Sequence, residues 1–293
     1  MAAAQPVLLQ GDRRMRRRRL VNRAVEVLAN VAALAAIAVL AAVVLSVLQR
    51  GIDVLSWGFL TKDLPLFGEA GGGIAPLIVG SAILVGIATV IALPLGVLTA
   101  LFLTEFASRR VAAPIQLTLD LMNGLPSIII AVFIFGLLVY GHEQSGYAGG
   151  FALSIVMLPL IARSAQEVLR LVPQAQREGA LALGASRWRT VLGIILPSAL
   201  GGIVTGTVLS IARAAGETAP LLFTTSIFIN TVSTDPGQAL PNLPVQIFIW
   251  SESPDPEDHT RAWASAFVLL VFVLVTSVLA RLALARSRKK LGQ

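Results

Sequence analysis

Residues 172–197 read VPQAQREGALALGASRWRTVLGIILP, a polar stretch between two long apolar runs. Pro173 suits the first turn of a helix, because its missing N–H is not needed there. A short helix of small residues is predicted from Glu178 to Leu183, and Gly184 is placed to end it. The first half of the stretch is therefore predicted to be a helix with a shallow surface, on which another protein can dock.

The second half of this stretch predicts another helix, from about Ser186 to Ile195, that stops at Pro197. Trp188 and the neighbouring arginines are also typical of an amphipathic hairpin that lies on a membrane surface. The pattern alone leaves both interpretations open, a docking loop or a surface hairpin.

The composition indicates a protein that is surrounded mainly by lipid. The chain has 293 residues, of which 56% are hydrophobic and only 13% are charged, whereas soluble domains have about 25% charged residues. The net charge of +7 comes from basic residues at the ends of apolar runs, which is how membrane topology is set rather than how nucleic acid is bound. The chain has no cysteine, which excludes disulfides and thiolate metal sites.

Six apolar runs are each long enough to cross a hydrocarbon core ~30 Å thick. We place these crossings at about Ala24–Leu48, Ile74–Phe102, Ile115–Val139, Ala148–Leu169, Ala199–Ile227 and Ala262–Leu284. The first run is longer than the apolar part of a secretory signal, usually about 7–15 residues, so we predict an uncleaved crossing. Pro126 could break the third segment, which would put Asp120 outside the lipid.

The distribution of Lys and Arg predicts the orientation of these crossings. Eighteen of the 23 Lys and Arg residues fall on one side and three on the other, so both termini are predicted to be cytoplasmic. The predicted organisation is a basic tail (1–23), a first transmembrane helix (24–48), a membrane domain (71–284) that contains the loop 172–197, and a second basic tail (285–293).

Two motifs that would indicate nucleotide or metal binding are incomplete. Gly179 and Gly184 have the glycine spacing of a phosphate-binding loop, but Ala185 stands where the lysine must be. His142 and Glu143 begin like a zinc-protease motif, but the second histidine is absent. We therefore predict no catalytic residue, no metal site and no ATPase in this chain.

Two arginines lie inside predicted crossings, where a charge costs at least ~2.5–3.5 kcal/mol. Arg163 is near enough to the cytoplasmic end of its crossing for its side chain to extend there, or it can line the transport path for an anion, as a second candidate beside Arg213. Arg213 is predicted near the middle of the fifth crossing, with Glu217 as an i+4 partner. The pair can be purely structural, or Arg213 can bind an anion in the transport path while Glu217 moderates its field and Thr218 adds a hydroxyl.

The spacing within 172–197 resembles the cytoplasmic EAA loop of ATP-binding-cassette importer permeases. The matching residues are Glu178, Gly184, Ile194, Leu196 and Pro197. Gly179 stands where the family usually has alanine, which keeps the surface small but lowers helix propensity. The resemblance implies that these residues, with Ala180, dock in a groove of a separate ATPase subunit and transmit its closure.

A second resemblance lies further along the chain. Residues 212–224, ARAAGETAPLLFT, look like the A-type permeases of phosphate-specific transport systems, as do LPVQIF at 243–248 and GGI at 72–74. The resemblance extends from about Gly71 to the C-terminus. It implies an all-α membrane protein with six transmembrane helices and the type I importer permease (MetI-like) fold, whose function is to translocate inorganic phosphate into the cell.

The same resemblance implies the partners and the location. The expected complex is this chain with a second, C-type permease, a dimer of ATPase subunits and an extracytoplasmic phosphate-binding protein, in the inner membrane of a bacterium. ATP and magnesium would be bound by the ATPase, so this non-catalytic chain needs no cofactor of its own. The lipid bilayer is the expected surrounding, and no nucleic acid is expected.

Four alternatives remain open. The nearest are a permease for another oxyanion, such as sulfate or molybdate, and the sister C-type phosphate permease. From other classes, an ATP-independent secondary transporter is disfavoured by the loop 172–197 and by the absence of inverted hydropathy symmetry. A membrane scaffold or sensor is disfavoured by the cost of Arg213 inside the membrane.

Overall fold

The computed structural model describes residues 11–66, 68–69, 71–225 and 229–290. Every regular element within these residues is helical. The chain forms two compact units, Met1–Gln49 and Arg50–Gln293. The first unit holds most of α1 (Gly11–Gly51), in which Met15–Gly51 is long and apolar enough to cross a membrane. Residues 1–10 and 291–293 of the two predicted tails lie outside the described part of the chain.

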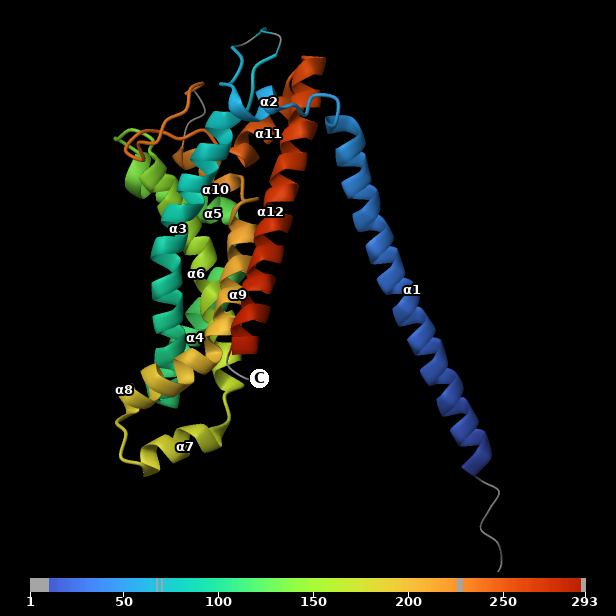
Figure 1. The fold of residues 1–293 in the computed structure, drawn as a ribbon, viewed down its shortest axis with the longest axis vertical. Helices are drawn as coiled ribbons and strands as arrows, with labels where there is room; N and C mark the ends of the chain where they lie inside the picture. Colours follow the sequence, from blue (N-terminus) through green and yellow to red (C-terminus); the bar gives the residue numbers. More distant parts are fainter. Residues whose placement is uncertain (1–10, 67, 70, 226–228, 291–293) are drawn as a thin grey trace, which may run out of the picture. The chain divides into compact units, whose positions relative to one another are not determined.

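The second unit is a bundle of helices (Figure 1). Its long members are α3 (Ala75–Leu101), α6 (Gly146–Arg170), α9 (Leu196–Ala214) and α12 (Pro256–Lys290). Beside them lie α4 (Arg109–Gly124), α5 (Ser127–Ile134) and α10 (Ala219–Thr224). At one end are α7 (Gln174–Ala182) and α8 (Arg187–Thr190), and at the other are α2 (Trp57–Thr61) and α11 (Leu243–Glu252). Three π-helical turns extend these helices: η1 (Phe102–Phe106), η2 (Phe135–Val139) and η3 (Val191–Ile195).

The predicted set of six crossings agrees with the helices of the structure. Five are single helices long and apolar enough to span a membrane. They are Met15–Gly51, Ala75–Phe106, Gly146–Arg170, Arg187–Ala214 and Pro256–Val278. The third predicted crossing corresponds to a bent pair of helices, α4 with α5 and η2.

The third predicted crossing, over Ile115–Val139, is broken in the structure. The chain bends by 99° between α4 and the helix Ser127–Val139. Leu125 and Pro126 both have extended backbone conformations at this bend, because a proline disfavours helical geometry in the residue before it and has no N–H to continue the ladder. The predicted break at Pro126 is therefore confirmed, and Asp120 lies on the separate helix α4.

The fifth crossing also differs from its predicted bounds, Ala199–Ile227. Its helix begins at Arg187 and ends at Ala214, and a turn then leads to the separate α10. Ile227 lies outside the described residues. Pro197 does not stop the preceding helix as predicted, because the π-helical turn η3 leads directly into α9, in whose first turn a proline needs no N–H donor.

Close helix contacts through glycine hold the bundle around α6. A Cβ atom on Gly96 of α3 would lie 2.9 Å from Ile161, and one on Gly150 of α6 would lie 2.5 Å from Ile87. On the α9 side of α6, a Cβ on Gly206 would overlap the side chain of Ser164. Small residues at these positions let the backbones approach closely, which is how helices associate within lipid.

Substitution of Gly206 by leucine is expected to destabilise the bundle by about 1–3 kcal/mol, the usual cost of an overpacked contact. The added side chain would force α9 away from Ser164 on α6. Gly86→Leu is the matched control, because Gly86 has open space around its missing Cβ. Thermal unfolding of the purified chain in detergent measures both variants, and equal midpoints for the two would contradict the packing argument.

Candidate functional site

The loop between α6 and α9 folds as the helical hairpin α7–α8. Pro173 is the N-cap of α7, so the first helix begins earlier than the predicted Glu178. Gly184 has a φ of +83°, a conformation that favours glycine. The N–H groups of Gly184 and Ala185 donate to the carbonyl oxygens of Leu181 and Ala180, which ends the helix. The predicted stop at Gly184 is confirmed.

The predicted coupling residues form an accessible surface on this hairpin. Glu178, Gly179 and Gly184 are exposed, and Cβ atoms on either glycine would meet nothing within 4 Å. Ala180 is buried beneath them. Pro197 is exposed in the first turn of α9, beyond η3 rather than in the hairpin. The hairpin thus presents a smooth face without bulky side chains at its two glycines.

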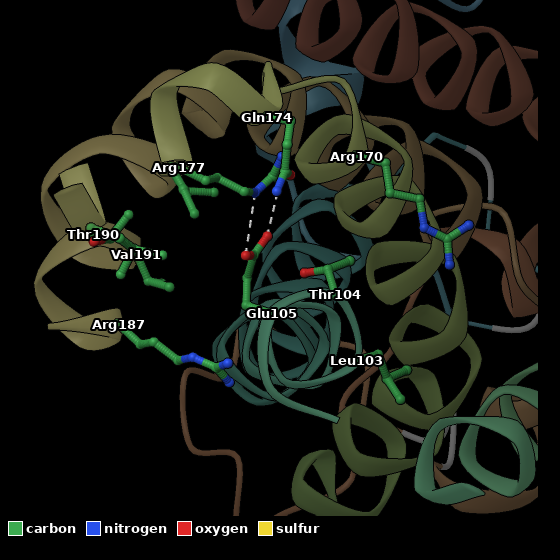
Figure 2. Close-up of a pocket in the computed structure, with 11 residues that line it drawn as sticks. Leu103, Thr104, Glu105, Arg170, Gln174, Arg177, Arg187, Thr190 and Val191 are labelled. Atoms are coloured by element: carbon green, nitrogen blue, oxygen red, sulfur yellow. Dashed lines mark hydrogen bonds and ion pairs between the residues drawn. The ribbon is translucent and has the colours of Figure 1, made fainter. Parts of the chain in front are cut away.

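The base of the hairpin is joined to the end of α3 around a pocket of about 530 Å³ (Figure 2). Arg177 of α7 faces Glu105 of η1, with 3.0 Å between Nη2 and Oε1 and 3.3 Å between Nε and Oε2. Both side chains are largely buried, 16% and 12% exposed. Arg177 also donates to the carbonyl oxygens of Leu169 and Val172 at the end of α6.

Arg213 and Glu217 line a second pocket, of about 180 Å³. Arg213 lies in the last turn of α9, because this helix ends at Ala214 rather than continuing past it as the predicted crossing does. Its Nε is 3.6 Å from Oε1 of Glu217, and the Arg213 side chain is 57% exposed whereas that of Glu217 is 17% exposed. Asn123 and Ser127, on either side of the bend between α4 and α5, line the same pocket.

The arrangement of this second pocket suits an oxyanion. Oε1 of Glu217 lies 3.6 Å from Nε of Arg213, and no hydrogen bond from the Arg213 guanidinium is found within the described residues. The guanidinium therefore has N–H donors that no described residue uses. The N-terminal end of α5 borders the pocket at Ser127 and carries the positive end of a helix dipole. Thr218 is half-buried at the start of α10 and is not among the lining residues.

Arg163 belongs to a different polar cluster, between α4 and α6. It forms an ion pair with Asp120 of α4. With the Gln116 amide turned to suit its neighbours, its oxygen accepts from Arg163 at 3.2 Å and its nitrogen donates to Oε1 of Gln166 at 2.8 Å. Arg163 does not line the pocket of Arg213, so the structure does not bring these two arginines together.

A family model for the inner membrane component of binding-protein-dependent transport systems matches residues 92–289. These residues include the α7–α8 hairpin, the pocket of Arg213 and the cluster of Arg163. The chain belongs to this family.

Relatives of the permease are phosphate transport system permease proteins named PstA. The Yersinia pestis protein is 38% identical over 84% of this chain and 84% of its own length. The Haemophilus influenzae protein is also 38% identical, over 82% and 85%. A Xylella fastidiosa relative, strain 9a5c, is 36% identical over 93% of this chain and 96% of its own length.

Solved structures share the fold of the permease. A structure titled as an inward-facing conformation of the MetNI methionine ABC transporter matches with a TM-score of 0.57 and 18% identity, over 73% of this chain and 94% of that one. A bacterial alginate ABC transporter in complex with a periplasmic protein gives a TM-score of 0.57 at 16% identity, over 80% and 85%. The expected MetI-like importer permease fold is confirmed.

Sequence reasoning missed two sets of residues that the fold of the permease brings together. Glu105 and Arg177 are 72 residues apart, and no spacing pattern links them. Gln116 and Gln166 were not singled out, although both are polar residues within or beside apolar runs, a signal that would have marked them as candidates for buried polar contacts.

Proposed function

We propose that this permease is one of two membrane subunits of an ATP-driven importer of inorganic phosphate. The observation that carries the proposal is the pocket at the bend between α4 and α5, where Arg213 keeps a largely exposed guanidinium beside a single carboxylate. The planar donors of arginine suit the oxygens of phosphate. The PstA relatives support the choice of phosphate over other oxyanions.

Glu217 gives this pocket the weak binding that transport needs. A carboxylate 3.6 Å from the Arg213 Nε offsets part of its charge and holds the side chain in place. An uncompensated arginine would bind a divalent anion too tightly for release, whereas conduction requires binding that is weak enough to leave. The pocket is open and has few anion-binding groups, so we propose that the second permease subunit completes it.

The remaining partners follow from the two ends of the bundle. The α7–α8 end carries Arg170, Arg177, Arg187 and Arg189, and we place it in the cytoplasm by the positive-inside rule. There the hairpin would dock on a dimer of ATPase subunits, which bind ATP and magnesium. The opposite end, with α2 and α11, would receive an extracytoplasmic phosphate-binding protein. In this scheme the permease itself performs no catalysis.

In the proposed cycle the ATPase subunits act on the α7–α8 hairpin, and the change is felt by the anion at the Arg213 pocket. ATP-driven closure of the ATPase subunits moves α7 and α8, and the permease pair opens outward to receive phosphate. Hydrolysis of ATP returns the pair to an inward-open state, as in alternating transitions between two packed arrangements. The anion passes Arg213 while it is shielded from water.

Proteoliposomes that contain the permease with its partner subunits test this proposal. We expect uptake of radiolabelled phosphate that requires ATP inside the vesicles and binding protein outside them, with no competition from an equal concentration of sulfate. Equal competition by sulfate or molybdate would contradict the phosphate assignment. Uptake that persists without the ATPase subunits would indicate a secondary transporter instead.

A further inference from the structure

Two adjacent residues at the end of α3 hold both arms of the α7–α8 hairpin. Glu105 binds Arg177 of α7 through two nitrogen–oxygen contacts. Phe106 packs against Trp188 of α8, with ring centroids 4.7 Å apart and an interplanar angle of 33°. Each arm of the hairpin is therefore joined to the same π-helical turn, η1, by an independent contact.

The Glu105–Arg177 ion pair is buried enough to be a strong connection. Arg177 uses two further donors on Leu169 and Val172, so one guanidinium joins α7, the end of α6 and η1. An arginine with a fork geometry satisfied by a carboxylate and two carbonyl oxygens is fixed in position. Removing the carboxylate would leave a buried charge without its partner, which is a costly change.

The turn η1 is continuous with α3, which runs the length of the bundle. Phe106 also packs against the cluster formed by α3, α6, η3 and α9, including Val191 and Ile195. The other end of α3 meets α11, where Ser81 accepts a hydrogen bond from the N–H of Leu243. The hairpin thus contacts one continuous helix, whose far end contacts the opposite end of the bundle.

We propose that Glu105 and Phe106 are positioning residues that carry the movement of the α7–α8 hairpin into α3. This proposal rests on the proposed function, because it assigns the route by which ATP hydrolysis reaches the transport path. A π-helical turn suits the role, since its extra residue per turn marks a local irregularity that is often found at functional sites.

The ratio of phosphate transported to ATP hydrolysed by the reconstituted complex tests the proposal. Glu105→Gln keeps the shape of the side chain but removes its charge, and we expect the ratio to fall about tenfold, within the range typical of coupling between sites. Arg177→Gln should give a similar fall, and the double variant should be no worse than either single one, because the residues act through each other. Glu26→Gln, an exposed carboxylate on α1, is the matched control and should leave the ratio unchanged.

Several outcomes would overturn the proposal. One is a wild-type ratio in Glu105→Gln, and another is independent, additive losses in the double variant. If Glu105→Gln does not yield an assembled complex, Phe106→Leu decides, because it keeps the ion pair and an apolar side chain beside the cluster of Val191 and Ile195 but removes the ring contact with Trp188. A ratio in that variant equal to wild type would refute the route through η1. Absence of ATP-driven phosphate uptake by the wild-type complex would instead contradict the proposed function.

Discussion

Replacement of Arg213 by glutamine is expected to reduce phosphate uptake at least ~30-fold while the complex still assembles. Loss of a charged partner from a polar contact costs ~2–5 kcal/mol, which corresponds to factors of this size. The side chain is 57% exposed at the end of α9, and its ion pair within the described residues is with Glu217 of the following turn. The loss should therefore appear in transport and not in folding.

Two further measurements separate the role of Arg213 from a structural one. Co-purification of the partner subunits with Arg213→Gln reports assembly, and thermal unfolding of the variant reports stability. Arg213→Lys should retain part of the uptake, because it keeps the positive charge but cannot bind an oxyanion with two parallel donors. Uptake by Arg213→Gln at the wild-type rate would show that the ion pair with Glu217 is purely structural.

Replacement of Gly184 by glutamate is expected to reduce transport-coupled ATP hydrolysis at least about tenfold, a typical strength of coupling between sites. Nothing in the permease lies within 4 Å of a Cβ at Gly184, and the position is exposed, so there is open space for the added side chain to leave the backbone. The glutamate side chain would obstruct an ATPase subunit that docks on the hairpin. The effect would therefore be loss of docking or coupling, with the membrane bundle intact.

The backbone at Gly184 requires its own control, because its φ of +83° is unfavourable for other residues by roughly 1–2 kcal/mol. Gly184→Asn is the matched variant, since asparagine tolerates this conformation better than other residues and adds a smaller, uncharged side chain. We expect it to retain most of the coupled hydrolysis. If the glutamate variant keeps coupled hydrolysis at the level of the asparagine variant, the hairpin face is not the docking surface.

The sequence predicts those features of the fold that are determined by residues close together along the chain. The crossings follow from runs of apolar residues, and the end of α7 follows from Gly184, because positive φ is a property of single residues. The bounds of the fifth crossing were wrong, since hydropathy does not detect that the chain turns after Ala214 while it stays apolar. Hydropathy also does not reveal the π-helical turn η3, which carries the helix on into α9. For this reason the sequence wrongly predicts a helix end at Pro197.

Contacts between distant segments could not be predicted in the same way. Arg213 and Glu217 were paired correctly because they are four residues apart on the chain. Their closeness to Asn123 and Ser127 depends on the bend at Pro126 and on the packing of α10 beside α5. Arg163 was placed in the transport path, and whether it acts there remains a prediction, since its partner in the structure is Asp120.

The glycine contacts on both sides of α6 have a mechanical consequence. Helices in which a glycine packs this closely against a side chain of the neighbouring helix cannot slide or tilt separately without opening empty space, which a close-packed interior resists. The helices α3, α6 and α9 should therefore rotate together as one block. Deformation during the cycle would then be concentrated at the short joints on either side of this block, around Pro126 and between Ala214 and Ala219. Both joints border the pocket of Arg213. A small rotation of the block would therefore change the width of this pocket more than the spacing of the helices inside the block.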